Sequence, residues 1–200
     1  DELSVKVQHR EEVSVTVMKR SSPSRRLVAE FMILCNSLLA EFCQEAGLPA
    51  IYRAQPAPRV PITHPKSEGP LERFLITQQL QSTKLDTVAS RHSGLGLPSY
   101  IQASSPLRRY LDLVMQRQIN HFLNHNRPFY STTSIAHLIQ MADVKLKEIN
   151  RIQEDRKRYW FLRYLQNSRL DDSTSTNPKS LFNSIVLENG PGRSALLELT

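Results

Sequence analysis

The sequence predicts an α+β chain that is mostly helical. Apolar and polar residues alternate over 3–18, which is typical of a half-buried β-hairpin. Apolar residues then recur at the three- and four-residue spacing of amphipathic helices through most of the chain. Near the C-terminal end, two short strand-like segments flank an Asn-Gly-Pro-Gly turn at 189–192.

The first elements are expected to be the hairpin and a long helix. A polar stretch over 8–12 separates the two alternating runs of the hairpin. Ser and Pro residues at 21–24 signal a helix start, and Gly47 is a natural stop. Glu30 lies roughly 120° from the middle of the apolar stripe, at about 100° per residue, so we expect it at the edge of the buried face. The stripe itself comprises Leu27, Phe31, Cys35, Leu38, Leu39, Phe42 and Ala46.

The middle of the chain is expected to be irregular before it becomes helical again. Residues 49–70 contain six prolines, which predict an extended loop. Short helices are expected at 70–80 and 84–90, and glycines and a proline over 94–98 mark a turn. A further helix is expected over 106–124.

A long helix is expected to follow from Ser134 to Gln166. Its middle is heavily charged, and a solvated face explains most of these charges, with a basic strip along an RNA backbone as the alternative. Residues 167–180 are rich in Ser, Thr, Asn and Asp and are expected to be a linker. Residues 181–187 and 195–199 are strand-like, and two strands alone do not make a stable barrel.

Composition limits the possible partners. The net charge of +7 favours an acidic partner, nucleic acid first, with a membrane surface or simple solubility as alternatives. We see no run of about 20 apolar residues, so no transmembrane helix is expected. Cys35 and Cys43 are expected to be buried, reduced core residues. The chain begins at Asp1, without Met and inside a strand-like segment, so we expect it to be part of a longer protein.

The most informative stretch is the start of the helix expected from Pro106. Ser105 is a good N-cap, and Pro106 fits the first helical position. Arg108 and Arg109 then add positive charge to a helix end that already has free N–H donors. Such an end suits a bound anion, and phosphate fits the planar, forked arginine best. The alternatives are that both arginines are solvated, or that Arg108 pairs with Asp112.

This stretch resembles the signature of the ribonuclease II / ribonuclease R (RNB) family. The resemblance rests on Tyr100, on Ser-Ser-Pro-Leu-Arg-Arg-Tyr at 104–110 and on Asp112, preceded by His-Ser-Gly-Leu-Gly at 92–96. Two earlier blocks are also similar to family segments: residues 27–36, on the first long helix, and residues 47–53 after it. Residues that depart from the common family pattern, Ala29, Gln102 and Gln116, suggest the cyanobacterial or plastid type.

The resemblance implies an activity and a domain plan. Relatives in this family hydrolyse single-stranded RNA from the 3′ end to nucleoside monophosphates, using Mg²⁺ held by a cluster of aspartates. Those aspartates belong to the first half of the family's catalytic domain, and this chain holds no such cluster, so the metal ligands are expected outside it. Residues 1–166 would be the C-terminal half of the RNB catalytic domain, 167–180 a linker, and 181–200 the start of an S1 domain of OB type.

The resemblance also assigns residues to roles. Arg108 matches the arginine that contacts the scissile phosphate, and Glu30 matches a glutamate near the metal, so these are the expected catalytic residues. A surface glutamate is the alternative for Glu30. For Arg109, a structural role is as well supported as a phosphate contact. Packing in the core is the alternative for Tyr110, and a neutral loop histidine is the alternative for His92. The expected RNA-binding residues are Arg109, Tyr110, Arg53, Tyr52, His92 and Ser105.

These observations together predict a 3′→5′ exoribonuclease, of which this chain is a part. The alternative is a catalytically inactive RNB-like module that only binds RNA, and a third class is a basic helical interaction protein. Single-stranded RNA is the expected partner, with Mg²⁺ as cofactor, no membrane association and a monomeric state. The sequence does not give the compartment, and the bacterial cytoplasm, a plastid and a mitochondrion all stay open.

Overall fold

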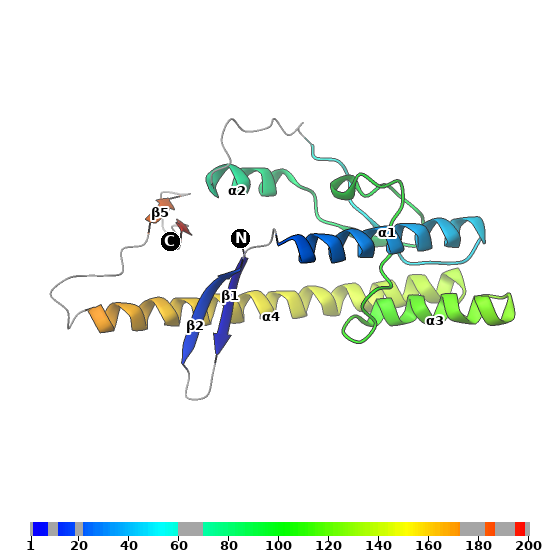
Figure 1. Cartoon of the computed structure of the whole chain (residues 1–200). Helices are drawn as coiled ribbons and strands as arrows, with labels where there is room; N and C mark the ends of the chain where they lie inside the picture. The colour runs from blue at the N-terminus through cyan, green and yellow to red at the C-terminus, as the bar shows by residue number, and fades with distance from the viewer. Residues whose placement is uncertain are drawn as a thin grey trace. The chain divides into compact units, whose positions relative to one another are not determined.

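The computed structural model describes residues 2–7, 12–18, 22–59, 70–172, 183–186 and 195–198. The chain forms two compact units (Figure 1), and each is described by itself. The larger unit comprises Pro23–Thr63 and Thr77–Glu148. The other comprises Asp1–Ser22, His64–Ile76 and Ile149–Thr200.

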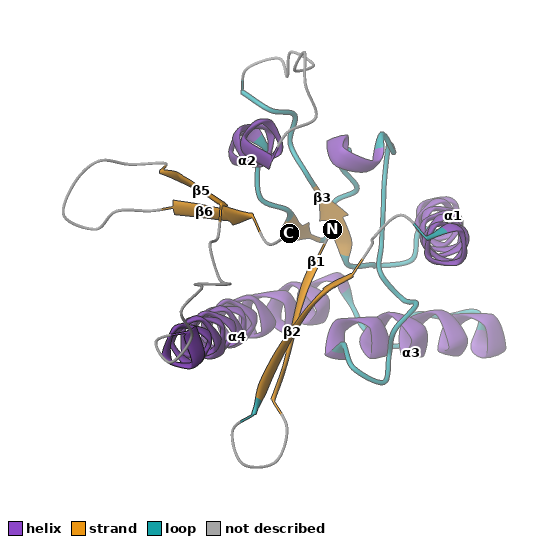
Figure 2. Cartoon of the chain, turned by 60° about the vertical axis from the view of Figure 1, so that its left-hand side comes forward, coloured by secondary structure: helices purple, strands orange, loops and turns teal. Residues whose placement is uncertain are grey.

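The larger unit contains the hydrophobic core and every expected site residue. Helix α1 (Pro23–Glu45) lies above helix α3 (Tyr110–His125) in both views of the chain (Figures 1 and 2). The rings of Phe42 and Phe122 meet edge to face between these helices, with centroids 6.0 Å apart. The buried core side chains are Ala40, Cys43, Leu48, Ala50, Ile51, Tyr52, Ile101, Ala103, Val114, Met115, Ile119 and Ile135.

Helix α1 has the predicted extent, and Leu39, Phe42 and Ala46 of its predicted stripe pack against the core. Asn36, Ala40 and Cys43 are its buried residues, whereas Leu27 and Phe31 of the predicted stripe are 60% and 61% exposed. The buried residues are small or polar, so they allow the backbone of the chain around residue 103 to approach the helix closely. Local apolar spacing counts large side chains, so it missed Asn36 and included residues of the stripe that are exposed.

The two cysteines on α1 also differ. Cys43 is buried as predicted, and burial raises the pKa of its thiol to about 11. Cys35 is exposed, so the prediction that it is a core residue is wrong. It fails for the same reason as the stripe, because Cys35 does not lie on the face that carries Asn36 and Cys43.

Among the described residues, α1 is also the one helix whose length and mean hydropathy would suit a membrane span. A single helix that passes such a test is weak evidence for a membrane span, so the expectation of no transmembrane helix stays a prediction. Core helices of globular proteins meet the same test, and α1 packs the face that carries Asn36 and Ala40 into the core. Only 17% of the apolar window is buried within the structure, so much of this helix is exposed.

Residues 84–90 do not form the predicted helix. They begin with strand β4 (Lys84–Asp86), which pairs antiparallel with β3 (Tyr52–Ala54). The side chains of 81–90 alternate between more and less exposed, and this period of two is that of extended chain. Tyr52 also bridges to Ile101 on the other side, so β3 links β4 to the core segment that leads to α3.

Helix α3 begins at Tyr110 and not at Pro106. The backbone N–H groups of Arg108 and Arg109 both donate to the carbonyl of Ser105, at 3.3 and 3.0 Å. Residues 105–108 therefore form a turn in which Pro106 occupies the second position, which its fixed φ favours. Arg109 is the N-cap residue, with an extended backbone (φ −122°, ψ 112°) and no side-chain cap hydrogen bond. The prediction of Ser105 as N-cap is thus wrong.

The remaining elements match the predicted types. Strands β1 (Glu2–Val7) and β2 (Val13–Met18) form the predicted hairpin, and α2 spans Pro70–Gln79. The predicted loop over 49–70 contains the short strand β3, and its residues 60–69 lie outside the described residues.

Helix α4 is longer than predicted, running from Thr132 to Asp172. The first part of the predicted linker is therefore helical, and 173–180 lies outside the described residues. Strands β5 (Asn183–Val186) and β6 (Ala195–Glu198) pair antiparallel. A pair of strands does not identify a barrel, so the S1 domain stays a prediction.

Candidate functional site

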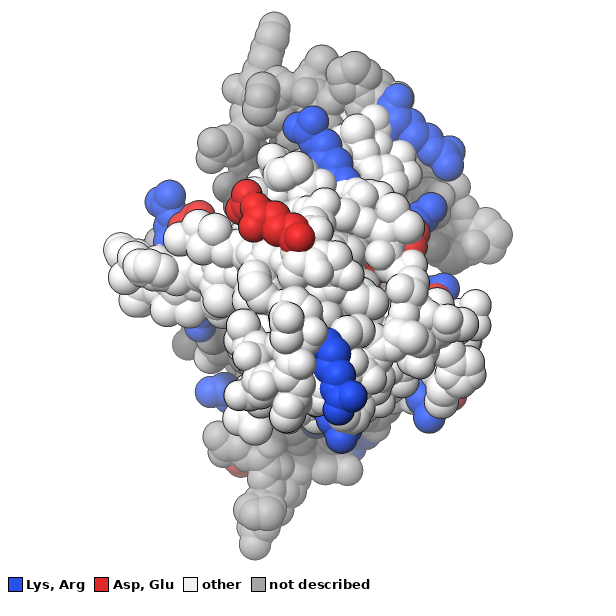
Figure 3. All heavy atoms as spheres, turned by 90° about the vertical axis from the view of Figure 1, so that its right-hand side faces the viewer, with Lys and Arg blue, Asp and Glu red and all other residues white. Residues whose placement is uncertain are grey.

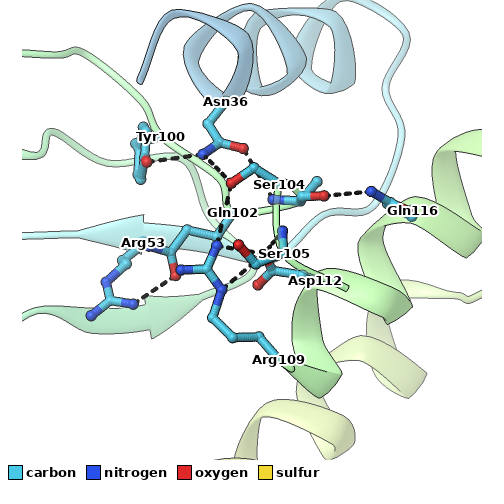
Figure 4. A network of polar contacts seen from close by, with 10 residues as sticks. Asn36, Arg53, Tyr100, Gln102, Ser104, Ser105, Arg109, Asp112 and Gln116 are labelled. Atoms are coloured by element: carbon cyan, nitrogen blue, oxygen red, sulfur yellow. Dashed lines mark hydrogen bonds and ion pairs between the residues drawn. The ribbon is translucent and has the colours of Figure 1, made fainter. Parts of the chain in front are cut away.

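Polar side chains from α1, from β3 and from α3 surround the turn at 104–109 (Figure 4). This turn carries the two arginines that the sequence singled out. It follows the core segment 99–103 directly, so the start of α3 is attached to a rigid part of the larger unit. The contacts around the turn define the candidate site.

Asp112 is the buried anchor of the turn, with 1% of its surface exposed. Its Oδ2 accepts hydrogen bonds from Nε and Nη2 of Arg109, at 2.9 and 2.6 Å, and from the backbone N–H of Ser105 at 2.8 Å. An acidic side chain three residues into a helix that reaches back in this way satisfies donors of the preceding turn. The partner of Asp112 is thus Arg109, and the alternative of a pair with Arg108 is wrong.

Asn36 holds the other side of the turn from the middle of α1. Its buried amide donates from Nδ2 to Tyr100 Oη at 3.0 Å and to Ser104 Oγ at 3.2 Å. Its Oδ1 accepts from the backbone N–H of Ala103 at 3.1 Å. A buried amide left without these partners would cost about 1–3 kcal/mol, so the contacts tie α1 to the segment 100–104. Sequence reasoning missed Asn36, although a lone Asn in an apolar helix is a detectable signal.

Arg108 projects from the turn into solvent. Its guanidinium makes no hydrogen bond or ion pair with any described residue, and its neighbour Leu107 is fully exposed. Arg109 is held inward by Asp112, so adjacent arginines face different environments. The exposed guanidinium of Arg108 can accept a phosphate, and its predicted catalytic role stays a prediction.

Glu30 is an exposed residue on α1, and it makes no hydrogen bond or ion pair with another described residue. Glu30 was expected at the edge of the buried face, and in the structure it lies at an exposed position. Its helix is the one that Asn36 attaches to the turn. Its role near the phosphate stays a prediction, as does the alternative of a surface glutamate.

Arg53 is placed on strand β3 and not in the predicted loop. Its Nη1 donates to Gln102 Oε1 at 2.7 Å and its Nη2 to Thr83 Oγ1 at 3.0 Å. Both acceptors are neutral, so the positive charge of Arg53 is not cancelled by an ion pair. Burial and then the nearby charge of Arg109 lower the pKa of Arg53. Gln102 and Thr83 together orient the guanidinium of Arg53.

Tyr52 and His92 are buried, with 4% and 7% of their surfaces exposed. Burial, and then the Cys43 thiol, raise the pKa of Tyr52 to about 12. The His92 ring meets the Tyr100 ring edge to face with centroids 5.6 Å apart, and its buried Nδ1 makes no hydrogen bond with the described residues. Burial and then Arg53 lower the pKa of His92, which favours the neutral imidazole. Neither side chain offers RNA an exposed group here.

Tyr110 and Ser105 also differ from the sequence expectations. Tyr110 is 60% exposed at the first residue of α3, so the alternative that it packs in the core is wrong. Ser105 contributes through its backbone, whose N–H and carbonyl groups hold the turn. Tyr110 is therefore available to a ligand beside Arg108, and its contact with RNA stays a prediction.

No three His, Cys, Asp or Glu side chains gather in the described part of the chain as a metal site requires. The buried carboxylate of Asp112 is already paired with Arg109. Mg²⁺ needs several oxygen ligands in octahedral geometry, and the described residues do not offer them. The Mg²⁺ expectation thus depends on the family resemblance alone.

The positively charged side chains do not form a cluster on the face that Figure 3 shows. Figure 3 views the face that carries the C-terminal ends of α1 and α3, where Lys and Arg side chains are scattered over mostly uncharged surface. A strip that follows an RNA backbone needs closely spaced cations.

Comparison of the sequence with known families and proteins gives consistent results. The family model described as the RNB domain matches residues 1–63 and 60–125. An uncharacterized ribonuclease of Synechocystis is 32% identical over 170 residues, covering 84% of this chain and 25% of that protein. The chloroplastic/mitochondrial ribonuclease II of Arabidopsis thaliana is 29% identical over 159 residues, covering 77% and 20%. The chain therefore spans about a quarter or less of these relatives.

Solved structures share the fold. The Dss1 exoribonuclease active-site mutant of Candida glabrata superposes with a TM-score of 0.81 at 22% identity, over 96% of this chain and 25% of that one. Mycoplasma genitalium RNase R in complex with ribose-methylated single-stranded RNA has a TM-score of 0.62 at 18% identity, over 84% and 32%. Yeast Ssd1, a pseudonuclease, has a TM-score of 0.51 at 17% identity, over 60% and 19%.

Proposed function

This chain belongs to the RNB family, and from that premise we propose that the protein containing it is an exoribonuclease that hydrolyses single-stranded RNA from the 3′ end to nucleoside monophosphates. The observation that carries the proposal is the turn at 104–109, which holds Arg109 inward and leaves Arg108 exposed. The family match and the names of the relatives support the ribonuclease class.

In this proposal Arg108 binds the scissile phosphate. The planar guanidinium donates to two phosphate oxygens at once and stays charged at any physiological pH. As negative charge builds on those oxygens in the transition state, an already oriented donor becomes more favourable than it was in the ground state. Arg108 therefore contributes mainly to the rate of cleavage.

Glu30 and Arg53 have supporting roles in the proposal. Glu30 orients Arg108 or the 3′ nucleotide, and Arg53 adds positive charge near the turn for a neighbouring phosphate. Metal-assisted activation of water needs ligands that the described residues do not provide. The proposal therefore assigns this chain the phosphate-binding part of the active site.

The alternative function is an RNB-like module that binds RNA without cleaving it. The likeness to yeast Ssd1, whose structure is described as a pseudonuclease, favours keeping this alternative, although the likeness shows the fold alone. The two functions differ in one property, which is the release of nucleotides from bound RNA.

The test uses the full-length protein that contains this chain, with Mg²⁺ and a single-stranded RNA labelled at its 5′ end. The proposal expects progressive shortening from the 3′ end and release of nucleoside monophosphates. Binding without shortening would support the inactive module, and neither binding nor shortening would support a basic interaction protein. Residues 1–200 alone are the control, and we expect them to release no monophosphate because they offer no described metal ligand set.

A further inference from the structure

The hydroxyl of Ser104 joins two groups of contacts around the turn (Figure 4). Its Oγ accepts a hydrogen bond from Asn36 Nδ2 at 3.2 Å and another from Arg109 Nη2 at 3.3 Å. Asn36 belongs to α1, and Arg109 belongs to the ion pair with Asp112. One oxygen atom thus connects the helix that carries Glu30 to the residue that directly follows Arg108.

We propose that Ser104 is a positioning residue for Arg108. This inference rests on the proposed function, since the position of Arg108 matters only if it contacts the reacting phosphate. Arg108 has no side-chain partner among the described residues, so the backbone of the turn alone fixes the point from which its side chain reaches a phosphate. The backbone of the turn is held to α3 by the hydrogen bond from the Ser105 N–H to Asp112. It is held to α1 by the hydrogen bond from Asn36 to the Ser104 hydroxyl.

The other contacts of the network do not replace the Ser104 link. Asn36 also bonds Tyr100 Oη and the Ala103 N–H, which both precede the turn. Asp112 bonds Arg109 and the Ser105 N–H, which lie within the turn. Gln116 of α3 also donates from Nε2 to the carbonyl of Ala103 at 2.6 Å, but this contact too lies ahead of the turn. Among the described side-chain hydrogen bonds, those of Ser104 Oγ join Asn36 directly to Arg109.

The link predicts a specific catalytic defect. Without the Ser104 hydroxyl, Arg109 keeps its ion pair, so the turn stays formed, but its orientation relative to α1 is less fixed. A misplacement of about 1 Å at a reacting centre costs up to about 10²-fold in rate. We therefore expect Ser104→Ala in the full-length protein to lower the single-turnover cleavage rate by about tenfold or more, with RNA affinity within about twofold of wild type.

Two matched variants separate positioning from general stability. Ser104→Thr keeps the hydroxyl, so it should restore the rate to within about threefold of wild type. Tyr100→Phe removes the other acceptor of the same Asn36 amide, at 3.0 Å, but does not touch the turn. It should lower the melting temperature about as much as Ser104→Ala while leaving the cleavage rate within about twofold of wild type.

The decisive arm combines Ser104→Ala with Arg108→Lys. If Ser104 acts through Arg108, Ser104→Ala should lower the rate by less than about twofold in the Arg108→Lys background, because coupled residues are not additive. The full separate loss in that background would overturn the inference, as would a Ser104→Ala protein that melts like Tyr100→Phe and cleaves like wild type. If Arg108→Lys alone leaves cleavage unchanged, the proposed role of Arg108 fails first, and this inference fails with it.

Discussion

Two adjacent arginines illustrate what the site depends on at the scale of single residues. Arg109 is bound through Nε and Nη2 by a carboxylate that is almost fully buried, whereas Arg108 is exposed. Local sequence treats the two arginines alike, and only the family resemblance favoured Arg108 for catalysis. The pairing of Arg109 with Asp112 depends on where α3 begins, so local sequence does not predict it.

A second residue-scale consequence concerns His92 and pH. Burial and the nearby Arg53 lower the pKa of His92 below its ordinary value of 6.5 in the folded chain. The unfolded chain therefore binds a proton at a pH where the folded chain does not, and the stabilisation present above pH 6.5 is lost as the pH falls through the folded pKa. We expect the free energy of unfolding of the chain to fall in this window.

The measurement is urea unfolding of residues 1–200 and of a His92→Gln variant from about pH 8 to about pH 5. The variant cannot titrate at this position, so its stability should fall less steeply with decreasing pH. Parallel pH profiles for the two proteins would show that His92 is not responsible.

At the scale of elements, repeating patterns were predicted well and contacts between distant segments were not. The β1–β2 hairpin and helices α1, α2 and α4 follow from local periodicity. The burial of Asn36 on α1 was missed because its partners Tyr100 and Ser104 lie more than 60 residues away in sequence. The segment 84–90 was misassigned because strand β4 is determined by its pairing with β3.

The start of α3 gives an element-scale prediction about stability. Asp112→Asn removes the charge that pairs with Arg109 at the beginning of the helix. Breaking a fully buried pair costs about 3–5 kcal/mol, and Arg109 keeps 28% of its side chain exposed, so we expect a loss of about 2–3 kcal/mol. Urea unfolding of residues 1–200 would measure the loss.

Helix α4 supplies the matched control. Asp143→Asn breaks the ion pair with Lys147, whose two side chains are 47% and 76% exposed, and should cost less than about 1 kcal/mol. If Asp112→Asn is no more destabilising than Asp143→Asn, the anchoring role of Asp112 is contradicted.

At the scale of the whole molecule, charge and family membership point to the same partner. The net charge of +7 favours an acidic ligand, and the RNB family match favours RNA. The described residues contain no group of carboxylates suited to Mg²⁺, and the chain spans a quarter or less of the two relatives compared. Sequence composition alone favoured an acidic partner, with a membrane surface or simple solubility as alternatives, and it did not indicate which face would bind one.

RNA binding by the chain should depend strongly on salt. Lys and Arg side chains that neutralise phosphates release counterions, so log K should fall linearly with log salt, at about −0.7 per phosphate contacted on a single strand. Fluorescence anisotropy with labelled oligo(A) at several salt concentrations gives the slope. An affinity that does not change with salt would contradict an electrostatic interface.

The most direct test of the central claim is Arg108→Lys in the full-length protein. The substitution keeps the positive charge and removes the planar fork, so single-turnover cleavage should slow by about 10²-fold, or roughly 3 kcal/mol, while RNA affinity changes little. Arg91→Lys, the same change at another exposed arginine of the larger unit, should leave both properties near wild type. Weaker RNA binding with an unchanged cleavage rate would make Arg108 a binding residue and contradict the account.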